Sequence, residues 1–416
     1  MRYSGWQLLR QAFQGNRGWK AHWRRPDPRP EYDVVIVGGG GHGLATAYYL
    51  ARQHDVGRIA VLEKGALGLG NVGRNTTVVR STYMLPGNGA FYSFSLGLWK
   101  GLAQELNYNV MFSPRGVISL FHSDGQRDAF ARMGNAMAIR GDQAVLLGRA
   151  ELRRLVPWLD YDNTRFPIFG ALLQPDAGTA RHDAVVWGYA RAADRLGVDL
   201  IENCEVTGFD IAGGRVCAVE TTRGRIAAGR VGIAVAGHSS RLAAMAGFRL
   251  PIESHVLQAF VTEGLKPVMD HVISYGMGHF YISQSDKGGL VFGGDLDGYA
   301  SYAQRGNLPL VEHVMEAGMT LMPMLGRARV LRSWGGVMDM SADGSPIIDR
   351  APVGGLYLNA GWCYGGFKAI PGSGVAFAHL LARDEPHPVA ACYRLDRFAT
   401  GHLIDEEGTG AFHNRH

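Results

Sequence analysis

The chain has 416 residues, a formal net charge of +5 and 46% hydrophobic residues, a balance typical of a globular protein with a large core. This length favours two interlocked domains. The sequence has no run of about 18 apolar residues, so we expect no membrane span. It also has no basic stripe with interleaved aromatic residues, so we expect no nucleic-acid partner.

The cysteines give no sign of a metal site or a disulfide framework. Cys204, Cys217, Cys363 and Cys392 are far apart and form no CxxC pair. Their use fits a reducing compartment. Arg24-Arg25 precedes the proline-rich stretch 26–30, where an export signal would have an apolar region. We therefore expect a cytoplasmic protein without a bound metal.

Residues 1–31 are expected to form an N-terminal arm and linker. Trp6, Leu8, Leu9 and Phe13 are spaced for a short amphipathic helix, and three prolines follow as an extended linker. Much of the chain's excess positive charge lies in this arm, in Arg2, Arg10, Arg17, Lys20, Arg24, Arg25 and Arg29. Such an arm either docks on a partner or lies in solvent.

A nucleotide-binding unit begins at Val34. The apolar run 34–37 predicts a buried strand, residues 44–53 predict a helix, and 59–62 predict the next strand. Gly38, Gly40 and Gly43 lie between the first strand and the helix, and Glu63 ends the second strand. This is the dinucleotide fingerprint: the glycines allow a tight turn, approach to a pyrophosphate and close helix packing, while the acid binds ribose hydroxyls.

The fingerprint does not by itself separate NAD from FAD. Its place at the start of a long chain, with a second glycine-rich segment at 334–374, favours FAD. Helices are expected near 91–106, 183–196 and 310–321. Strands are expected at 117–121, 199–201, 216–221 and 231–235, with antiparallel strands within 252–300.

These elements predict an α/β fold: a Rossmann-type FAD-binding domain with an inserted, mainly antiparallel-sheet substrate domain. The FAD-binding domain is expected to be discontinuous, over 32–110, 180–250 and 330–400. The substrate domain is expected over 111–179 and 251–329, with a C-terminal tail at 401–416.

The sequence resembles the D-amino-acid-oxidase-like FAD superfamily, and within it the β subunits of heterotetrameric sarcosine oxidases and of N-methylglutamate dehydrogenase complexes. The resemblance covers essentially the whole chain. Its most specific segments are 37–50 (VGGGGHGLATAYYL), 74–81 (RNTTVVRS), 180–185 (ARHDAV), 247–255 (GFRLPIESH) and 365–369 (GGFKA).

The resemblance implies two flavins. It implies FAD contacts from Gly41, His42, Glu63, Lys64, Asn71, Thr76, Val78 and Val206, with Gly365, Gly366 and Lys368 near the isoalloxazine. It also implies an FMN attached covalently to His182, which we expect in the loop before a helix whose N-terminus keeps the imidazole neutral. Gly336 stands where monomeric sarcosine oxidases carry their FAD-linking cysteine, so we expect non-covalent FAD.

Arg80 and Lys368 are the candidates for binding a substrate carboxylate, with Arg74 as the weaker alternative to Arg80. The implied reaction is oxidative demethylation of an N-methyl amino acid, by hydride transfer to FAD with electrons passed to FMN. The implied products are the amino acid and formaldehyde, or a one-carbon unit for tetrahydrofolate on a partner subunit of α, γ or δ type.

Several alternatives stay open. Altered residues at 362–364 and at Ile370 keep N-methylglutamate beside sarcosine as substrate. No lysine stands near Val291, where the monomeric enzymes have one that activates oxygen, so the electron acceptor is open. The chain is alternatively a stand-alone FAD-dependent D-amino-acid or amine dehydrogenase, or an electron-transfer or scaffold subunit without turnover. Intact Arg80 and Lys368 argue against the last of these.

Overall fold

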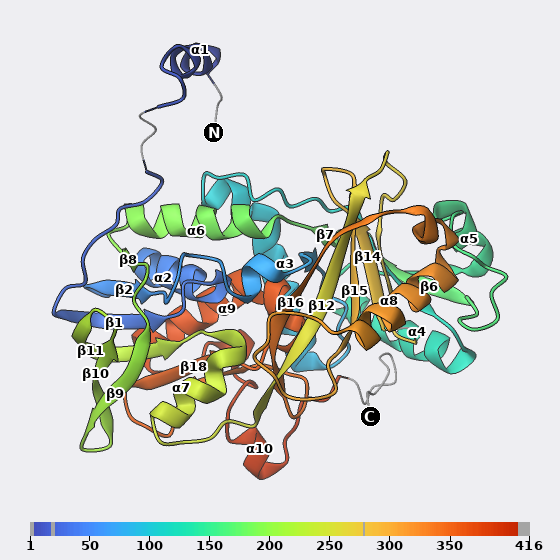
Figure 1. The fold of residues 1–416 in the computed structure, drawn as a ribbon. Coiled ribbons are helices and arrows are strands. Elements are labelled where there is room, and N and C mark those ends of the chain that lie inside the picture. Colours follow the sequence, from blue (N-terminus) through green and yellow to red (C-terminus); the bar gives the residue numbers. More distant parts are fainter. Residues whose placement is uncertain (1–3, 18–20, 278, 407–416) are drawn as a thin grey trace.

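The chain folds around two eight-stranded sheets, shown by a computed structural model that describes residues 4–17, 21–277 and 279–406 (Figure 1). The first sheet lies on the left of Figure 1 and the second on the right. Within the described ranges, no helix is both long and apolar enough to cross a bilayer.

The first sheet is the nucleotide-binding type that the fingerprint predicts. In spatial order its strands are β17 (Ile347–Arg350), β18 (Leu356–Ala360), β11 (Gly224–Ile233), β1 (Glu31–Val37), β2 (Ile59–Leu62) and β8 (Asp199–Ile201), with β10 (Arg215–Thr221) and β9 (Val206–Ala212) branching from β11. From β18 to β8 all neighbours are parallel. Parallel strands of this kind are covered on both faces, and the residues 34–37 of β1 and 59–62 of β2 are accordingly apolar and buried.

Helices cover one face of this sheet. They are α2 (Gly41–Gln53), α3 (Pro86–Glu105), α6 (His182–Arg195) and α9 (Gly366–Arg383). Val34 and Ile36 of β1 face these helices, whereas Val35 and Val37 pack on the opposite side. The helices α2 and α9 cross closely at Gly374, where only glycine fits: a Cβ at this position would lie 2.6 Å from the Ala45 Cβ.

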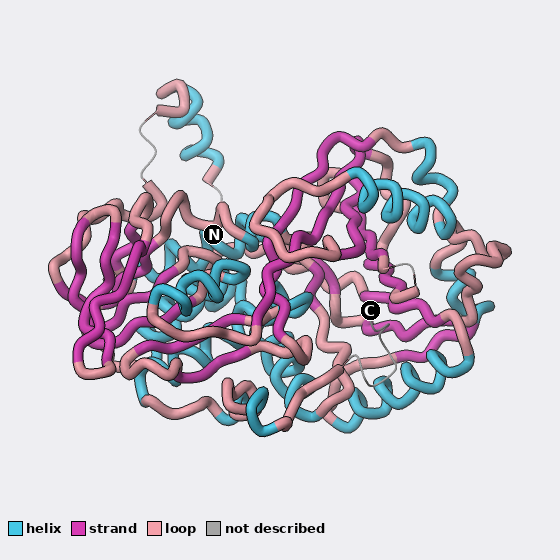
Figure 2. The backbone as a smooth tube through the Cα atoms, turned by 60° about the horizontal axis from the view of Figure 1, so that its bottom comes forward, coloured by secondary structure: helices cyan, strands magenta, loops and turns pink. Residues whose placement is uncertain are grey.

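The second sheet is mainly antiparallel. Its strands, in spatial order, are β16 (Val330–Ser341), β12 (Ile252–Gly264), β15 (Gly289–Leu296), β14 (Phe280–Gln284), β13 (Val272–Tyr275), β4 (Val117–Phe121), β6 (Gly170–Gln174) and β5 (Val145–Gly148). Only the β13–β4 pair is parallel among these. The helices α4 (Asp124–Ile139), α5 (Arg149–Leu155) and α8 (Leu308–Leu321) pack around it (Figure 2).

The remaining elements join these layers. A two-stranded sheet pairs β3 (Val78–Val79) with β7 (Gly178–Thr179). The short helices α7 (Ser239–Met245) and α10 (Arg397–Thr400) complete the fold. The predicted arm helix is present as α1 (Gly5–Phe13) and stands apart from the two sheets in both views; Arg2 and Lys20 of the arm lie outside the described residues.

The predicted fold class is confirmed, with differences at three places. Residues from 330 onward were expected in the first domain, but β16 belongs to the second sheet. It pairs with β12 along its whole length, a long-range contact that the local sequence does not indicate. His182 is the first residue of α6 rather than part of the preceding loop. The C-terminal segment was expected to be a tail, yet Glu406 is buried.

The buried ion pair between Arg397 and Asp343 gives a test of how the C-terminal segment is held. Arg397 Nε and Nη2 lie 2.7 and 2.8 Å from the Asp343 carboxylate oxygens, and both residues are buried. Arg397→Leu leaves that carboxylate without its cation, so we expect the free energy of unfolding to fall by about 3–5 kcal/mol in urea denaturation. Arg394→Leu, which removes an ion pair between two exposed side chains, should lower the free energy of unfolding far less. Equal losses in the two variants would contradict this prediction.

Candidate functional site

The glycine loop after β1 requires glycine at two of its three fingerprint positions. Gly38 has φ +112°, and a Cβ there would lie 2.3 Å from the Ala234 carbonyl oxygen. A Cβ on Gly43 would lie 1.9 Å from the Gly38 carbonyl oxygen, so helix α2 begins directly against the turn. A Cβ on Gly40 would meet nothing closer than 4.0 Å, because this residue faces open space.

That space is a cavity of about 380 Å³, which we call the glycine-loop cavity. It is lined by Gly38, Gly40, Gly41, His42, Glu63, Lys64, Asn71, Val206 and Gly366, among others. The N-termini of both α2 and α9 open onto it, which places backbone N–H groups and positive dipole ends at its wall. These features fit an elongated anionic cofactor, with the pyrophosphate at a helix start.

Glu63 is held firmly at the end of β2. Its two carboxylate oxygens accept hydrogen bonds from Gly39 N (2.9 Å) and Gly65 N (3.0 Å). The carboxylate is thereby fixed where an adenosine ribose would lie in a fingerprint site.

His42 contributes a neutral ring to the same wall. Its imidazole stacks on Trp362 (4.7 Å between centroids) and is hydrogen-bonded to Ser373. Burial lowers the pKa of His42 to about 3, so the ring carries no charge at neutral pH. Asp339 lines the cavity nearby and accepts hydrogen bonds from Gly361 N (2.7 Å) and Trp362 N (3.1 Å), which hold the loop that leads to α9.

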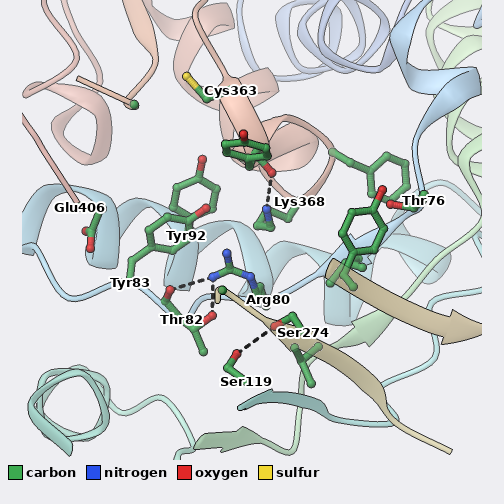
Figure 3. A pocket seen from close by; sticks show the side chains of 18 of the residues that line it. Thr76, Arg80, Thr82, Tyr83, Tyr92, Ser119, Ser274, Cys363, Lys368 and Glu406 are labelled. Carbon is green, nitrogen blue, oxygen red and sulfur yellow. Dashed lines mark hydrogen bonds between the residues drawn. The ribbon is translucent and has the colours of Figure 1, made fainter. Parts of the chain in front are cut away.

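A second cavity, of about 290 Å³, contains two cations. We call it the Arg80–Lys368 cavity; Figure 3 shows both side chains pointing into it. Burial first, and then the Arg80 charge, hold the pKa of Lys368 well below its ordinary value. The two cavities share Asn75, Met338, Cys363 and Phe367 as lining residues, so they meet along one wall.

Two stacked tyrosines lie beneath the cations. The rings of Tyr83 and Tyr92 are 3.9 Å apart and nearly parallel. Arg80 lies over the Tyr83 ring at 5.1 Å, and the Lys368 ammonium lies 5.9 Å from the Tyr92 ring. Electron-rich ring faces stabilise cations in an apolar setting, which helps two positive charges share this cavity.

Helix α9 positions Lys368 through a local break in its backbone ladder. Pro371 has no N–H to donate within the helix. The N–H that proline lacks is the helical donor for the Phe367 carbonyl, and the next residue, Gly372, donates its N–H to Ser95 Oγ (3.3 Å). The Lys368 carbonyl accepts hydrogen bonds from Ser95 Oγ (2.7 Å) and Trp99 Nε1 (2.9 Å) of α3. The Lys368 ammonium donates to the Tyr364 carbonyl (2.7 Å).

The structure divides the predicted FAD contacts between the two cavities. Thr76, Val78, Gly365 and Lys368 line the Arg80–Lys368 cavity rather than the glycine-loop cavity. Gly43 lines neither and serves helix packing. Arg74 lines the glycine-loop cavity and donates to Gln304 Oε1 (2.8 Å), so the loop turns Arg80, and not Arg74, toward Lys368.

His182 lies apart from both lining sets, at the first turn of α6. Its side chain is one-third exposed, and burial lowers its pKa, which favours the neutral imidazole. The next residue, Asp183, pairs with Arg181 at 2.6 Å. The arrangement gives a neutral, partly accessible ring nitrogen at a helix start.

Several lining residues were not found from the sequence. Tyr92 lay in the helix expected near 91–106, Tyr83 lay outside every expected helix and strand, and Glu406 lay in an expected tail. Cys363 has φ +48° and lies at the shared wall, where burial raises the pKa of its thiol to about 12. No local motif marks these residues, because the cavity is made by segments distant in sequence.

Comparison with known proteins identifies the class. Residues 33–380 match the family described as FAD dependent oxidoreductase, and the chain belongs to this family. It is an FAD-dependent oxidoreductase, as the sequence predicted.

Particular relatives narrow the class further. The chain is 64% identical to sarcosine oxidase subunit beta of Rhizobium meliloti (strain 1021), over all of both chains. It is 49% identical to sarcosine oxidase subunit beta of Rhodobacter capsulatus, over 97% of this chain and 98% of the relative. Among solved structures, L-proline dehydrogenase from P. horikoshii superposes with a TM-score of 0.84 at 26% identity, covering 91% of this chain and 100% of that one.

The contact at Gly43 predicts a cofactor defect. Gly43→Ala places a methyl group 1.9 Å from a carbonyl oxygen, so α2 must move away from the turn that the cofactor would occupy. We expect at least about a 10-fold weaker Kd for FAD, measured by fluorescence titration of deflavinated protein. Gly101→Ala in the exposed face of α3, where a Cβ meets nothing within 4 Å, is the matched control and should bind FAD normally. Unchanged FAD affinity in Gly43→Ala would contradict the assignment.

Proposed function

We propose that this chain is the substrate-oxidising, β-type subunit of a hetero-oligomeric N-methyl-amino-acid oxidoreductase, which demethylates sarcosine or N-methylglutamate. One observation carries the proposal: Arg80 and Lys368 lie together in a largely apolar cavity that shares a wall with the glycine-loop cavity. The sarcosine oxidase β subunits to which the chain is similar support this substrate class.

The cavity residues bind and orient the substrate. A guanidinium and an ammonium together hold one carboxylate, and this fixes the attached methylamine. Met338, Phe367 and Leu257 provide apolar walls that keep water from the reacting carbon. The chain supplies orientation and charge rather than an acid–base pair.

FAD is held non-covalently in this proposal, by the glycine loop, Glu63 and the N-terminus of α9. When bound, it supplies the hydride acceptor. Loss of a hydride from the N-methyl carbon of the neutral amine leaves an iminium ion, which adds water, loses a proton and gives the primary amino acid and formaldehyde. Tetrahydrofolate on a partner subunit would take the one-carbon unit instead.

The second flavin in this proposal is FMN, joined to the neutral ring of His182 and receiving the electrons from FAD. The exposed α1 helix and the one-third-exposed His182 suit a chain that assembles with partner subunits of α, γ or δ type. The competing proposal is a stand-alone dehydrogenase of D-amino acids or amines, which would carry one flavin.

Substrate oxidation can be tested with the purified complex. Sarcosine should reduce the bound flavin anaerobically and release glycine and formaldehyde; N-methylglutamate is tested in parallel. Lys368→Met removes one charged contact and should weaken the binding of the unreactive carboxylate methylthioacetate by about 10-fold to 100-fold. Lys100→Met, an exposed lysine paired with Asp176, is the control. Flavin reduction by D-alanine but not by N-methyl amino acids would favour the competing proposal.

The buried ammonium also predicts a pH dependence. The pKa of Lys368 lies well below the ordinary lysine value of 10.5, so this side chain loses its proton at a lower pH than an exposed lysine does. A carboxylate needs the protonated form, so the Kd for methylthioacetate should rise with pH in the wild type and stay flatter in Lys368→Met. Equal pH slopes in the two proteins would contradict this role for Lys368.

The proposed FMN linkage predicts a modified peptide. After denaturation of the complex and proteolysis, mass spectrometry should find FMN on the peptide that contains His182, while FAD is released unattached. His182→Asn should lose the attached flavin and keep its FAD. His402→Asn, an exposed histidine elsewhere, should change neither. A His182 peptide of unmodified mass would remove the second flavin from the proposal.

A further inference from the structure

The C-terminal segment returns to the Arg80–Lys368 cavity and is fixed there by partly buried hydrogen bonds. Ile404 N donates to Asp343 Oδ2 (2.9 Å), and Ser345 Oγ donates to the Ile404 carbonyl (2.6 Å). Asp343 is itself held by the ion pair with Arg397. Both backbone groups of Ile404 are thus hydrogen-bonded, two residues before Glu406.

Glu406 binds the turn that precedes α3. Its carboxylate oxygens accept hydrogen bonds from Met84 N (3.0 Å) and Leu85 N (2.9 Å), and the residue is 7% exposed. Leu85 is the N-cap of α3 and Met84 precedes it, so one carboxylate pairs with the N–H groups of two successive residues at the entry to the helix and fixes the turn. Asn88, in the first turn of α3, adds a further hydrogen bond to Glu406.

The same turn carries the supports of Arg80. Arg80 Nη1 donates to the Thr82 carbonyl (2.8 Å) and to the Thr82 hydroxyl. The guanidinium lies over the ring of Tyr83. Its supports are therefore the two residues that immediately precede Met84 and Leu85, whose N–H groups Glu406 holds.

Glu406 also brings a negative charge to this cavity. Of the described lining residues, the charged ones are Arg80, Lys368, Asp343 and Glu406, and Asp343 pairs with Arg397. Figure 3 shows Glu406 beyond the stacked rings of Tyr83 and Tyr92, on the side away from Lys368. Burial raises the pKa of Glu406, while the two N–H groups, Asn88 and Arg80 lower it.

We propose that Glu406 is a positioning residue for substrate binding: it holds the turn 82–85, and through Thr82 and Tyr83 it sets the orientation of the Arg80 guanidinium. This inference rests on the proposed function, because it takes Arg80 as a carboxylate ligand. It assigns a role in the site to a residue near the end of the chain. A helix cap without this role would stabilise α3 but leave carboxylate binding to Arg80 unaffected.

A double-mutant cycle in the flavin-loaded complex separates these possibilities. The variants are Glu406→Ala, Arg80→Met and the double variant, and the readout is the Kd for methylthioacetate from the change in flavin absorbance. If Glu406 acts through Arg80, Glu406→Ala should weaken binding about 10-fold in the wild-type background and under 2-fold in Arg80→Met. Sarcosine turnover should show a raised KM with kcat changed by less than about 3-fold.

Two further variants keep the test decisive. Glu406→Gln retains the shape and one acceptor oxygen, so it should fold and give an intermediate Kd. Asp405→Asn, at an exposed neighbour, should leave the Kd unchanged. Equal effects of Glu406→Ala in both backgrounds, or no effect in either, would overturn the inference.

The outcome for the proposed function is read separately. Oxidation of sarcosine by the wild type tests that function without any Glu406 variant. If Arg80→Met alone leaves the Kd unchanged, Arg80 is not the carboxylate ligand, and both the substrate-binding proposal and the inference fail. If Arg80→Met weakens binding but the cycle shows no coupling, only the inference fails.

Discussion

The placement of two positive charges in one buried, largely apolar cavity is the constraint on which the rest of the site depends. Arg80 and Lys368 come from different segments, and burial together with mutual repulsion opposes protonation of the lysine. The fold offsets this cost locally, with tyrosine faces beneath both groups and a carbonyl that accepts from the ammonium. An anionic ligand, such as the carboxylate of the proposed substrate, would complete the compensation.

This pair is held by two different kinds of support. Lys368 depends on α9 and on α3, whose Ser95 and Trp99 side chains donate to the Lys368 carbonyl. Arg80 depends on a turn, which is held from the far end of the chain. Helix α3 takes part in both, because it begins at the Glu406 contact and carries the donors that meet Lys368. Movement of α3 would therefore disturb both cations together.

The sequence alone predicted the nucleotide-binding turn and its two flanking strands. The apolar run at β1, the glycine turn and Glu63 are adjacent in sequence, so their geometry follows from steric rules that act over a few residues. Arg80 and Lys368 were found through resemblance, and the structure places them in one cavity. The membership of β16 and the burial of Glu406 were missed, because both depend on pairing with segments far away in the chain.

The return of the C-terminal segment to the cavity also has a consequence for synthesis. Strand β1 lies between β2 and β11 in the first sheet. Strand β18, which pairs with the other edge of β11, is synthesised long after β1 and β2. Glu406 is translated later still, after every other residue that lines the cavity. The first βαβ unit is therefore complete in the nascent chain long before the cation-bearing cavity has all its walls, so a chain that stops ahead of residue 406 would carry the nucleotide-binding segment without a finished site.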